Sequence, residues 1–186
     1  MLYFAFGSNM NFAHLTGWLQ EFGVEVEPQV VSIAFLHDFR LRANYLASRG
    51  LGAANIEAAE GWRVEGILYR ITPAIQTGLR AKEGWPVRYE EIEVLVNVPE
   101  RLRRVRALTY HVTQECSLPK DIPVSSRYRQ FILEGARMGG LTAEYQDFLR
   151  RFLVTPEMLL TRKLASRPVS FDRFNCDHEF AQPTLS

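Results

Sequence analysis

The chain has 186 residues, of which 47% are hydrophobic, and its formal net charge at pH 7 is +1. A chain of this length can bury one sizeable core, and nothing in its composition indicates a second domain. The balanced charge gives no case for a nucleic acid or a membrane surface as partner. No apolar run approaches the roughly 18–20 residues that span a bilayer, and no leader is recognisable, so we expect neither a membrane segment nor a cleaved signal.

The first strand and the turn after it dominate the start of the chain. Residues 1–6 form an apolar and aromatic run that breaks at Gly7, Ser8 and Asn9. This pattern predicts a buried strand that delivers a loop, whose backbone amides are suited to a carboxylate or phosphate. The commoner alternative is a strand that ends in a tight turn.

An amphipathic helix follows, with Asn11 as its N-cap, Gly23 at its end and apolar residues at helical spacing. Residues 30–35 and 38–41 predict strands, and residues 43–61 predict a long loop that holds a brief strand at 55–57. Such a loop is either functional or a plain surface excursion.

Residues 64–71 predict another strand, and Thr72 with Pro73 marks a helix start. We expect that helix to be short because Gly78 and Gly84 bracket it. Two alternating runs, 89–98 and 103–113, predict a pair of antiparallel strands. Arginines at 101–106 fit a solvated strand edge better than a nucleic-acid site.

The last third of the chain predicts helices. Ser125 and Ser126 cap one helix that ends at Gly139 and Gly140, and Thr142 caps the next. A final helix is expected over 157–164, followed by an irregular tail whose aromatic residues, Phe171, Phe174 and Phe180, would wrap the domain or a partner subunit.

Residues that could ligate a metal ion or act as nucleophiles are scattered along the chain. The two cysteines, Cys116 and Cys176, lie far apart without a CxxC pattern, so we expect reduced thiols, a cytoplasmic protein and no zinc site. Adjacent residues rarely converge on one substrate, so Cys176, Asp177 and His178 do not predict a catalytic site. We expect no metal and no cofactor, because the histidines are isolated, at His14, His37, His111 and His178.

Three stretches, in order, resemble one known family. They are residues 4–10 (Phe-Ala-Phe-Gly-Ser-Asn-Met), residues 79–84 (Leu-Arg-Ala-Lys-Glu-Gly) and residues 123–145, which begin Pro-Val-Ser-Ser-Arg-Tyr. The chain is similar over about residues 1–153 to the γ-glutamylcyclotransferase-like, or AIG2-like, family. One departure is that Phe6 stands where the family usually has tyrosine.

The resemblance implies an α+β fold: a small mixed, mostly antiparallel β-barrel flanked by short helices. It implies a single domain over residues 1–164, with 165–186 as a C-terminal tail, in a monomer or homodimer. The strand-rich order of predicted elements fits this fold and does not fit a doubly wound nucleotide fold.

The resemblance also implies a reaction and a small-molecule γ-glutamyl substrate, in the setting of glutathione metabolism. The α-amino nitrogen of a γ-glutamyl group would attack its own γ-carbonyl, releasing 5-oxoproline and a free amine or amino acid, with Glu83 as general acid and base. Two alternatives remain: removal of a γ-glutamyl cap from a larger amine such as an antibiotic intermediate, and a non-catalytic binding module. Retention of Glu83 argues against the binding module, whereas Phe6 keeps it open.

The matched positions give the expected site. The amides of the opening loop would take the substrate's carboxylate or the oxyanion, and tyrosines would support the pocket. For Tyr89 and Tyr110 core packing is an equally good interpretation. Besides Glu83, the expected substrate-binding residues are Phe6, Gly7, Ser8, Asn9, Met10, Tyr89, Tyr110 and Tyr128.

Overall fold

The computed structural model describes residues 1–47, 50–99 and 103–165. The predicted aromatic tail and the sequence Cys176, Asp177, His178 lie outside the described residues, as does Arg101 of the arginine cluster. The prediction of one domain ending near residue 164 therefore stays a prediction.

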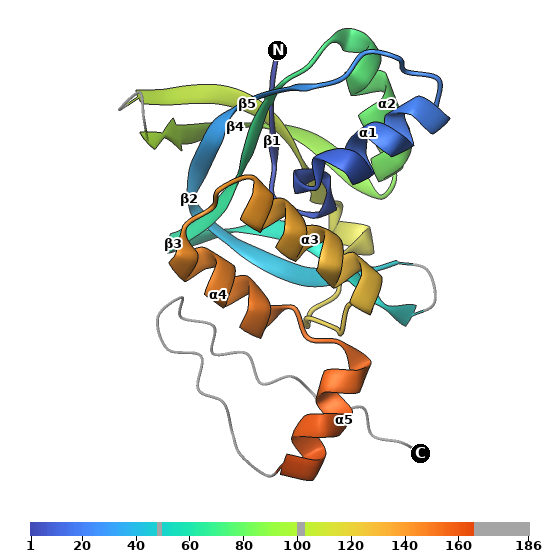
Figure 1. The fold of residues 1–186 in the computed structure, drawn as a ribbon, viewed down its shortest axis with the longest axis vertical. Coiled ribbons are helices and arrows are strands. Elements are labelled where there is room, and N and C mark those ends of the chain that lie inside the picture. The colour runs from blue at the N-terminus through green and yellow to red at the C-terminus, as the bar shows by residue number, and fades with distance from the viewer. Residues whose placement is uncertain (48–49, 100–102, 166–186) are drawn as a thin grey trace.

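Five strands form a closed barrel in the order β1-β3-β2-β4-β5 (Figure 1). Neighbouring strands are antiparallel except for β1 and β5, which pair in parallel. The barrel is thus mixed and mostly antiparallel, which confirms the predicted fold class. The strands are β1 (Leu2–Ala5), β2 (Gln29–Leu46), β3 (Gly52–Arg70), β4 (Tyr89–Val98) and β5 (Arg103–Val112).

The predicted loop over residues 43–61 is wrong. Most of it belongs to the ends of β2 and β3, which pair along their whole length with irregularities, one of them at Asp38, whose φ is 60°. The two separate strands predicted around residues 36–37 are one strand. Polar side chains at this end of the pair take part in a network: buried Asn44 donates to half-buried Glu57 at 2.8 Å, and buried Arg42 donates to Asp121 at 2.8 Å. Because each finds a partner, polar residues are tolerated inside these strands.

Helices α1 (Phe12–Glu21) and α2 (Pro73–Glu83) pack against each other beside the barrel (Figure 1). The predicted caps are confirmed: Asn11 accepts from the amide of His14 at 3.0 Å, and Thr72 accepts from the amide of Ile75 at 3.3 Å. Gly84 ends α2 in the left-handed conformation, with φ 69°. Gly78, however, does not bracket α2 but lies inside it, where a Cβ atom would come within 2.7 Å of Leu19 on α1.

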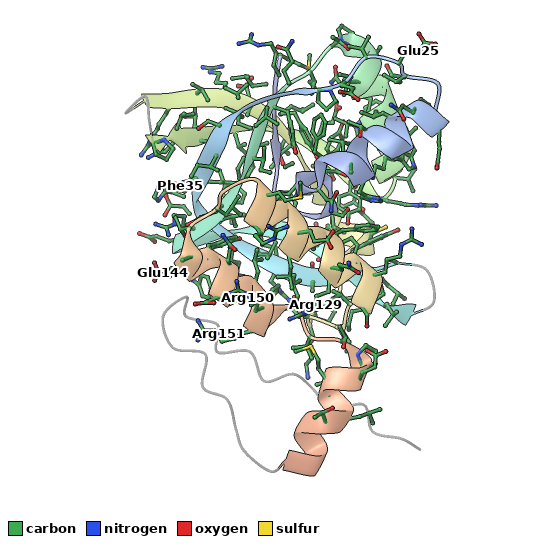
Figure 2. All side chains as sticks on the ribbon, in the orientation of Figure 1. Glu25, Phe35, Arg129, Glu144, Arg150 and Arg151 are labelled. Carbon is green, nitrogen blue, oxygen red and sulfur yellow. The ribbon has the colours of Figure 1, made fainter. Side chains whose placement is uncertain are left out.

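Helices α3 (Ser126–Met138) and α4 (Ala143–Phe152) cover another part of the barrel, and α5 (Pro156–Ala165) extends away from it (Figure 1). Ser125 and Thr142 cap α3 and α4 as predicted. Arg129 of α3 and Arg150 of α4 lie close together (Figure 2), and the Arg129 guanidinium donates to the Arg150 carbonyl at 3.1 Å. This bond ties the two helices at the end of α4, where helix carbonyls lack partners.

The opening loop is held between β1 and α3. It forms one 3-10 turn, η1 (Ser8–Met10), directly after β1. Gly135 of α3 allows the closest approach, because a Cβ atom there would lie 2.5 Å from the backbone of Met10 and Asn11. Within the described part of the chain, no helix has the length and apolar character needed to cross a membrane.

Candidate active site

A cavity of about 320 Å³, measured together with the solvent at its mouth, lies where β1 meets the opening loop. It draws residues from the start of the chain, from β3, from the end of α2, from β4 and β5, and from the start of α3. Its lining residues are Tyr3, Phe6, Gly7, Ser8, Asn9, Ala54, Glu83, Tyr89, Tyr110 and Tyr128. Three segments that are distant in sequence and were singled out by motif thus meet in one place.

Glu83 is the last residue of α2, and Gly84 turns the chain away directly after it. The side-chain Nδ2 of buried Asn9 donates to Glu83 Oε1 at 2.9 Å and also to the hydroxyl of Tyr3 at 2.8 Å. The loop after β1 therefore orients the carboxylate. A carboxylate at the C-terminal end of a helix gains nothing from the helix dipole, so its position is set by these contacts.

Burial raises the pKa of Glu83 above its ordinary value, since the tyrosine-lined cavity solvates the charged form poorly. The hydrogen bond from Asn9 and the charge of Lys82 oppose this shift without cancelling it. A carboxyl group with a raised pKa is a stronger base than an exposed one and keeps its proton to higher pH. Its environment suits proton transfer in both directions.

The three predicted tyrosines all reach the cavity. Tyr89 donates to the carbonyl of Ala54 at 3.0 Å, and Tyr128 accepts from the amide of Ala54 at 2.9 Å. Tyr110 donates to Glu91 at 2.7 Å. Burial raises the pKa of Tyr128 to about 12, so its hydroxyl keeps its proton at neutral pH. These residues serve packing and the cavity at once, so the two interpretations offered by the sequence are not exclusive.

Of the opening loop, Gly7, Ser8 and Asn9 line the cavity together with Phe6. Gly7 faces two other lining residues, since a Cβ atom there would lie 3.3 Å from Ala54 Cβ and 3.5 Å from the Tyr128 hydroxyl. Met10 is not among the lining residues: it is 1% exposed, and its amide donates to the carbonyl of Gly7 at 3.0 Å. The Met10 amide is thus committed to the turn.

Sequence reasoning missed two lining residues, Tyr3 and Ala54. Tyr3 carried a signal, because a hydroxyl inside an apolar strand has to find a buried partner, here Asn9. Ala54 carried none, because its methyl group has no chemistry and its stretch was predicted to be loop. Its backbone amide and carbonyl anchor Tyr128 and Tyr89.

A basic pair lies next to the cavity. Lys82 Nζ is 3.2 Å from His14 Nε2, and the His14 ring stacks on Phe131 with 4.0 Å between ring centres. Burial, followed by the charges of Lys82 and Arg127, lowers the pKa of His14 to about 4. Burial lowers the pKa of Lys82 to about 8, and the Glu83 charge opposes that change. At neutral pH His14 is therefore neutral and accepts from the Lys82 ammonium.

Among the described residues, no three side chains of His, Cys, Asp or Glu gather in a way that would hold a metal ion. The groups that line the cavity are one carboxylate, one amide, hydroxyls and backbone. These groups can bind a polar small molecule and move a proton.

Comparison with known proteins finds relatives of this small closed barrel, in which a carboxylate faces a Gly-Ser-Asn loop. The model of the AIG2-like family matches residues 63–149, a range that includes Glu83, Tyr89, Tyr110 and Tyr128. A γ-glutamylcyclotransferase from Bos taurus is 29% identical in an alignment of 158 residues that covers 80% of this chain and 76% of the bovine protein.

Solved structures show the same relationship. A γ-glutamyl cyclotransferase superimposes with a TM-score of 0.71 at 25% identity, covering 88% of this chain and 98% of that one. The uncharacterized protein loc79017 from Homo sapiens gives 0.66 at 26% identity, covering 87% and 97%. The chain is thus similar to the AIG2-like family over residues 63–149, and to γ-glutamylcyclotransferases in sequence and in fold.

Proposed function

We propose that the protein is a γ-glutamyl cyclotransferase, which converts a γ-glutamyl amine or amino acid into 5-oxoproline and the free amine. The observation that carries the proposal is that Glu83, its pKa raised by burial, lines the same cavity as the Gly7–Asn9 loop and is held there by Asn9 at 2.9 Å. The bovine relative and one structural neighbour, both named for this activity, support it.

The reaction needs positioning and one proton carrier. Nucleophile and electrophile belong to one substrate molecule, so holding the folded conformer contributes up to about 7–11 kcal/mol. The cavity is lined by four tyrosines and Phe6, and its small size favours such a conformer over an extended one. The amides of the Gly7–Asn9 loop and the Tyr128 hydroxyl are the donors for the substrate's carboxylate and for the oxyanion.

Glu83 moves the proton. It takes a proton from the substrate's α-ammonium, and the freed nitrogen lone pair attacks the γ-carbonyl carbon. The tetrahedral intermediate collapses as Glu83 returns the proton to the leaving nitrogen, and the carbon–nitrogen bond breaks. Glu83 then takes the second proton from the ring nitrogen, which leaves a neutral lactam, and passes it to the departing amine or to water. We assign the transfer to Oε2, because Oε1 accepts the hydrogen bond from Asn9.

The test is to incubate the protein with a panel of γ-glutamyl amides and γ-glutamyl amino acids and to measure 5-oxoproline. Wild-type protein should release 5-oxoproline and the matching amine in equal amounts, and Glu83→Gln should release neither. Binding of the γ-glutamyl compounds without any 5-oxoproline would contradict the proposal and leave a binding module. The panel also reports whether small or large amines leave faster.

A further inference from the structure

Three of the four tyrosines that line the cavity differ in how their single hydroxyl proton is used. Tyr110 donates its hydroxyl proton in a hydrogen bond to Glu91, and Tyr89 donates its own to the Ala54 carbonyl. Tyr128 accepts from the Ala54 amide and also interacts with the backbone and side chain of Ser8. A phenol whose proton is committed can only accept further hydrogen bonds. The Tyr110 oxygen is therefore an acceptor for whatever binds beside it.

The acceptor state of Tyr110 depends on Glu91 of β4. Besides Tyr110, Glu91 Oε1 takes hydrogen bonds from Arg80 Nε at 2.9 Å and Gln76 Nε2 at 3.1 Å, and Arg80 also bonds to Oε2. The Glu91 side chain is only 12% exposed. Burial alone would raise the pKa of Glu91, but the bonds from Arg80, Tyr110 and Gln76 outweigh it and hold the pKa below its ordinary value. The carboxylate stays ionised, so it cannot donate to Tyr110.

The same contacts tie Glu91 to the helix that carries the proposed proton carrier. Gln76, Arg80 and Glu83 stand at i, i+4 and i+7 on α2, so they share one face of that helix. The Arg80 guanidinium also lies over the Trp85 ring, 4.4 Å from its centre, just after the end of α2. Through its hydrogen bonds, Glu91 of β4 thus holds Tyr110 of β5 in place. It also holds the face of α2 that carries Glu83 against β4.

We infer that Glu91 is a positioning residue that holds Tyr110 as a hydrogen-bond acceptor for the substrate's α-amino group. The inference rests on the proposed function. Once Glu83 has taken one proton, the amine keeps two N–H bonds and a lone pair, and one N–H donated to Tyr110 limits the directions in which the lone pair can point. A carboxylate or carbonyl oxygen, which needs a donor, is disfavoured at the same spot.

The experiment compares γ-glutamyl methylamide with glutaric monomethylamide, which lacks only the α-amino group. Their affinities are taken from the KM of the first and the inhibition constant of the second, and calorimetry replaces both if turnover is absent. Wild-type protein should prefer the compound that has the amino group. Tyr110→Phe should reduce that preference by about ten- to hundredfold, as expected for a lost hydrogen bond to a charged group.

Glu91→Leu should reduce the preference to a similar extent, and Tyr110→Phe combined with Glu91→Leu should do no further harm, because the two residues act as one unit. Glu93→Gln is the matched control, since Glu93 lies on the same strand, is 63% exposed and pairs with Arg106. It should leave the preference unchanged.

Different failures have different meanings. Full preference in Tyr110→Phe, which keeps the ring and the fold, would overturn the inference, as would full preference in a folded Glu91→Leu or additive losses in the double variant. If wild-type protein neither binds nor turns over γ-glutamyl methylamide or any member of the wider panel, the proposed function fails, and the inference with it.

Discussion

Glu83 carries two demands at the scale of a single residue: it has to accept a proton from an ammonium group and then donate one to a poor leaving group. Burial next to Asn9 raises its pKa and holds it in place. A carboxylate exposed to water would lack both properties.

The first prediction is that Glu83→Gln keeps the fold but lowers turnover by at least about a hundredfold, the usual contribution of general acid–base catalysis. Glutamine preserves the shape and removes the proton carrier. The measurement is the rate of 5-oxoproline release, with circular dichroism as the control for folding. A rate near that of the wild type would show that another group moves the proton.

The second prediction separates Phe6 from Gly7. Phe6→Tyr should change turnover by less than about tenfold, or about 1.4 kcal/mol of barrier, because Phe6 is 7% exposed and contributes packing. Gly7→Val should abolish substrate binding, since its branched side chain would crowd Ala54 and the Tyr128 hydroxyl. Both are compared on folded protein by KM and calorimetry. Normal turnover by Gly7→Val would place carboxylate recognition elsewhere.

Residues with a local signature could be predicted from the sequence, and residues without one could not. Gly7, Ser8 and Asn9 follow an apolar strand, and Glu83 precedes a helix-ending glycine, so turn chemistry marks their places. The role of Glu83 came only through the family resemblance. Ala54 lies in the long β2–β3 pair, a stretch that was predicted to be loop. The Tyr110–Glu91 bond depends on the exact register of β4 and β5, which their predicted pairing left open.

At the scale of elements, the site depends on how closely α3 approaches the opening loop. At Gly135, which has no side chain, α3 packs directly against the backbone at the end of η1, the turn that carries Ser8 and Asn9. Interiors are packed densely enough that one added methyl group against backbone has to move something. The loop that holds Glu83 is therefore sensitive to a helix outside the cavity.

The third prediction uses two helical glycines. Gly135→Ala should destabilise the protein by about 1–3 kcal/mol and lower kcat, because its Cβ would lie 2.5 Å from the backbone of Met10 and Asn11. Gly17→Ala in α1 is the control: nothing lies within 4 Å of its Cβ, so it should stabilise by up to about 1 kcal/mol. Urea unfolding and turnover measure both. Equal effects of the two variants would contradict the packing argument.

Helices with clear caps were predictable, and β2 and β3 were not. Asn11, Thr72, Ser125 and Thr142 each cap the helix that the sequence predicted. The distal half of the β2–β3 pair is rich in Ala, Gly and Asn, which local propensity assigns to loops. Strand pairing and the buried polar network override that propensity, and both are long-range effects.

At the scale of the whole molecule, the proposed chemistry needs only groups that the chain supplies. The fourth prediction is that turnover needs no added cofactor and survives a chelator, since no metal-binding cluster exists among the described residues and proton transfer falls to Glu83. The assay is 5-oxoproline release before and after dialysis against EDTA. Loss of activity that a divalent ion restores would contradict it.

The last prediction concerns stability against pH, where two partly buried groups act in opposite directions. The pKa of His14 falls from 6.5 to about 4 in the folded protein, so its contribution is complete above about pH 6.5 and is lost as pH falls toward 4. The pKa of Glu83 is raised above 4.5, so its contribution is complete below that value and is lost as pH rises through the folded pKa.

Removing either group should therefore raise the melting temperature relative to the wild type at one end of the pH range. The melting temperature of Glu83→Gln, relative to wild type, should rise as pH increases above about 4.5, by about 2–4 °C for each kcal/mol relieved. His14→Phe, which keeps a ring to stack on Phe131, should gain as pH falls from 6.5 to 4. Parallel curves for wild type and both variants would mean that neither group is titrated differently by folding. A Glu83→Gln gain confined to low pH would reverse the sign of its shift and remove the electrostatic basis for its role as base.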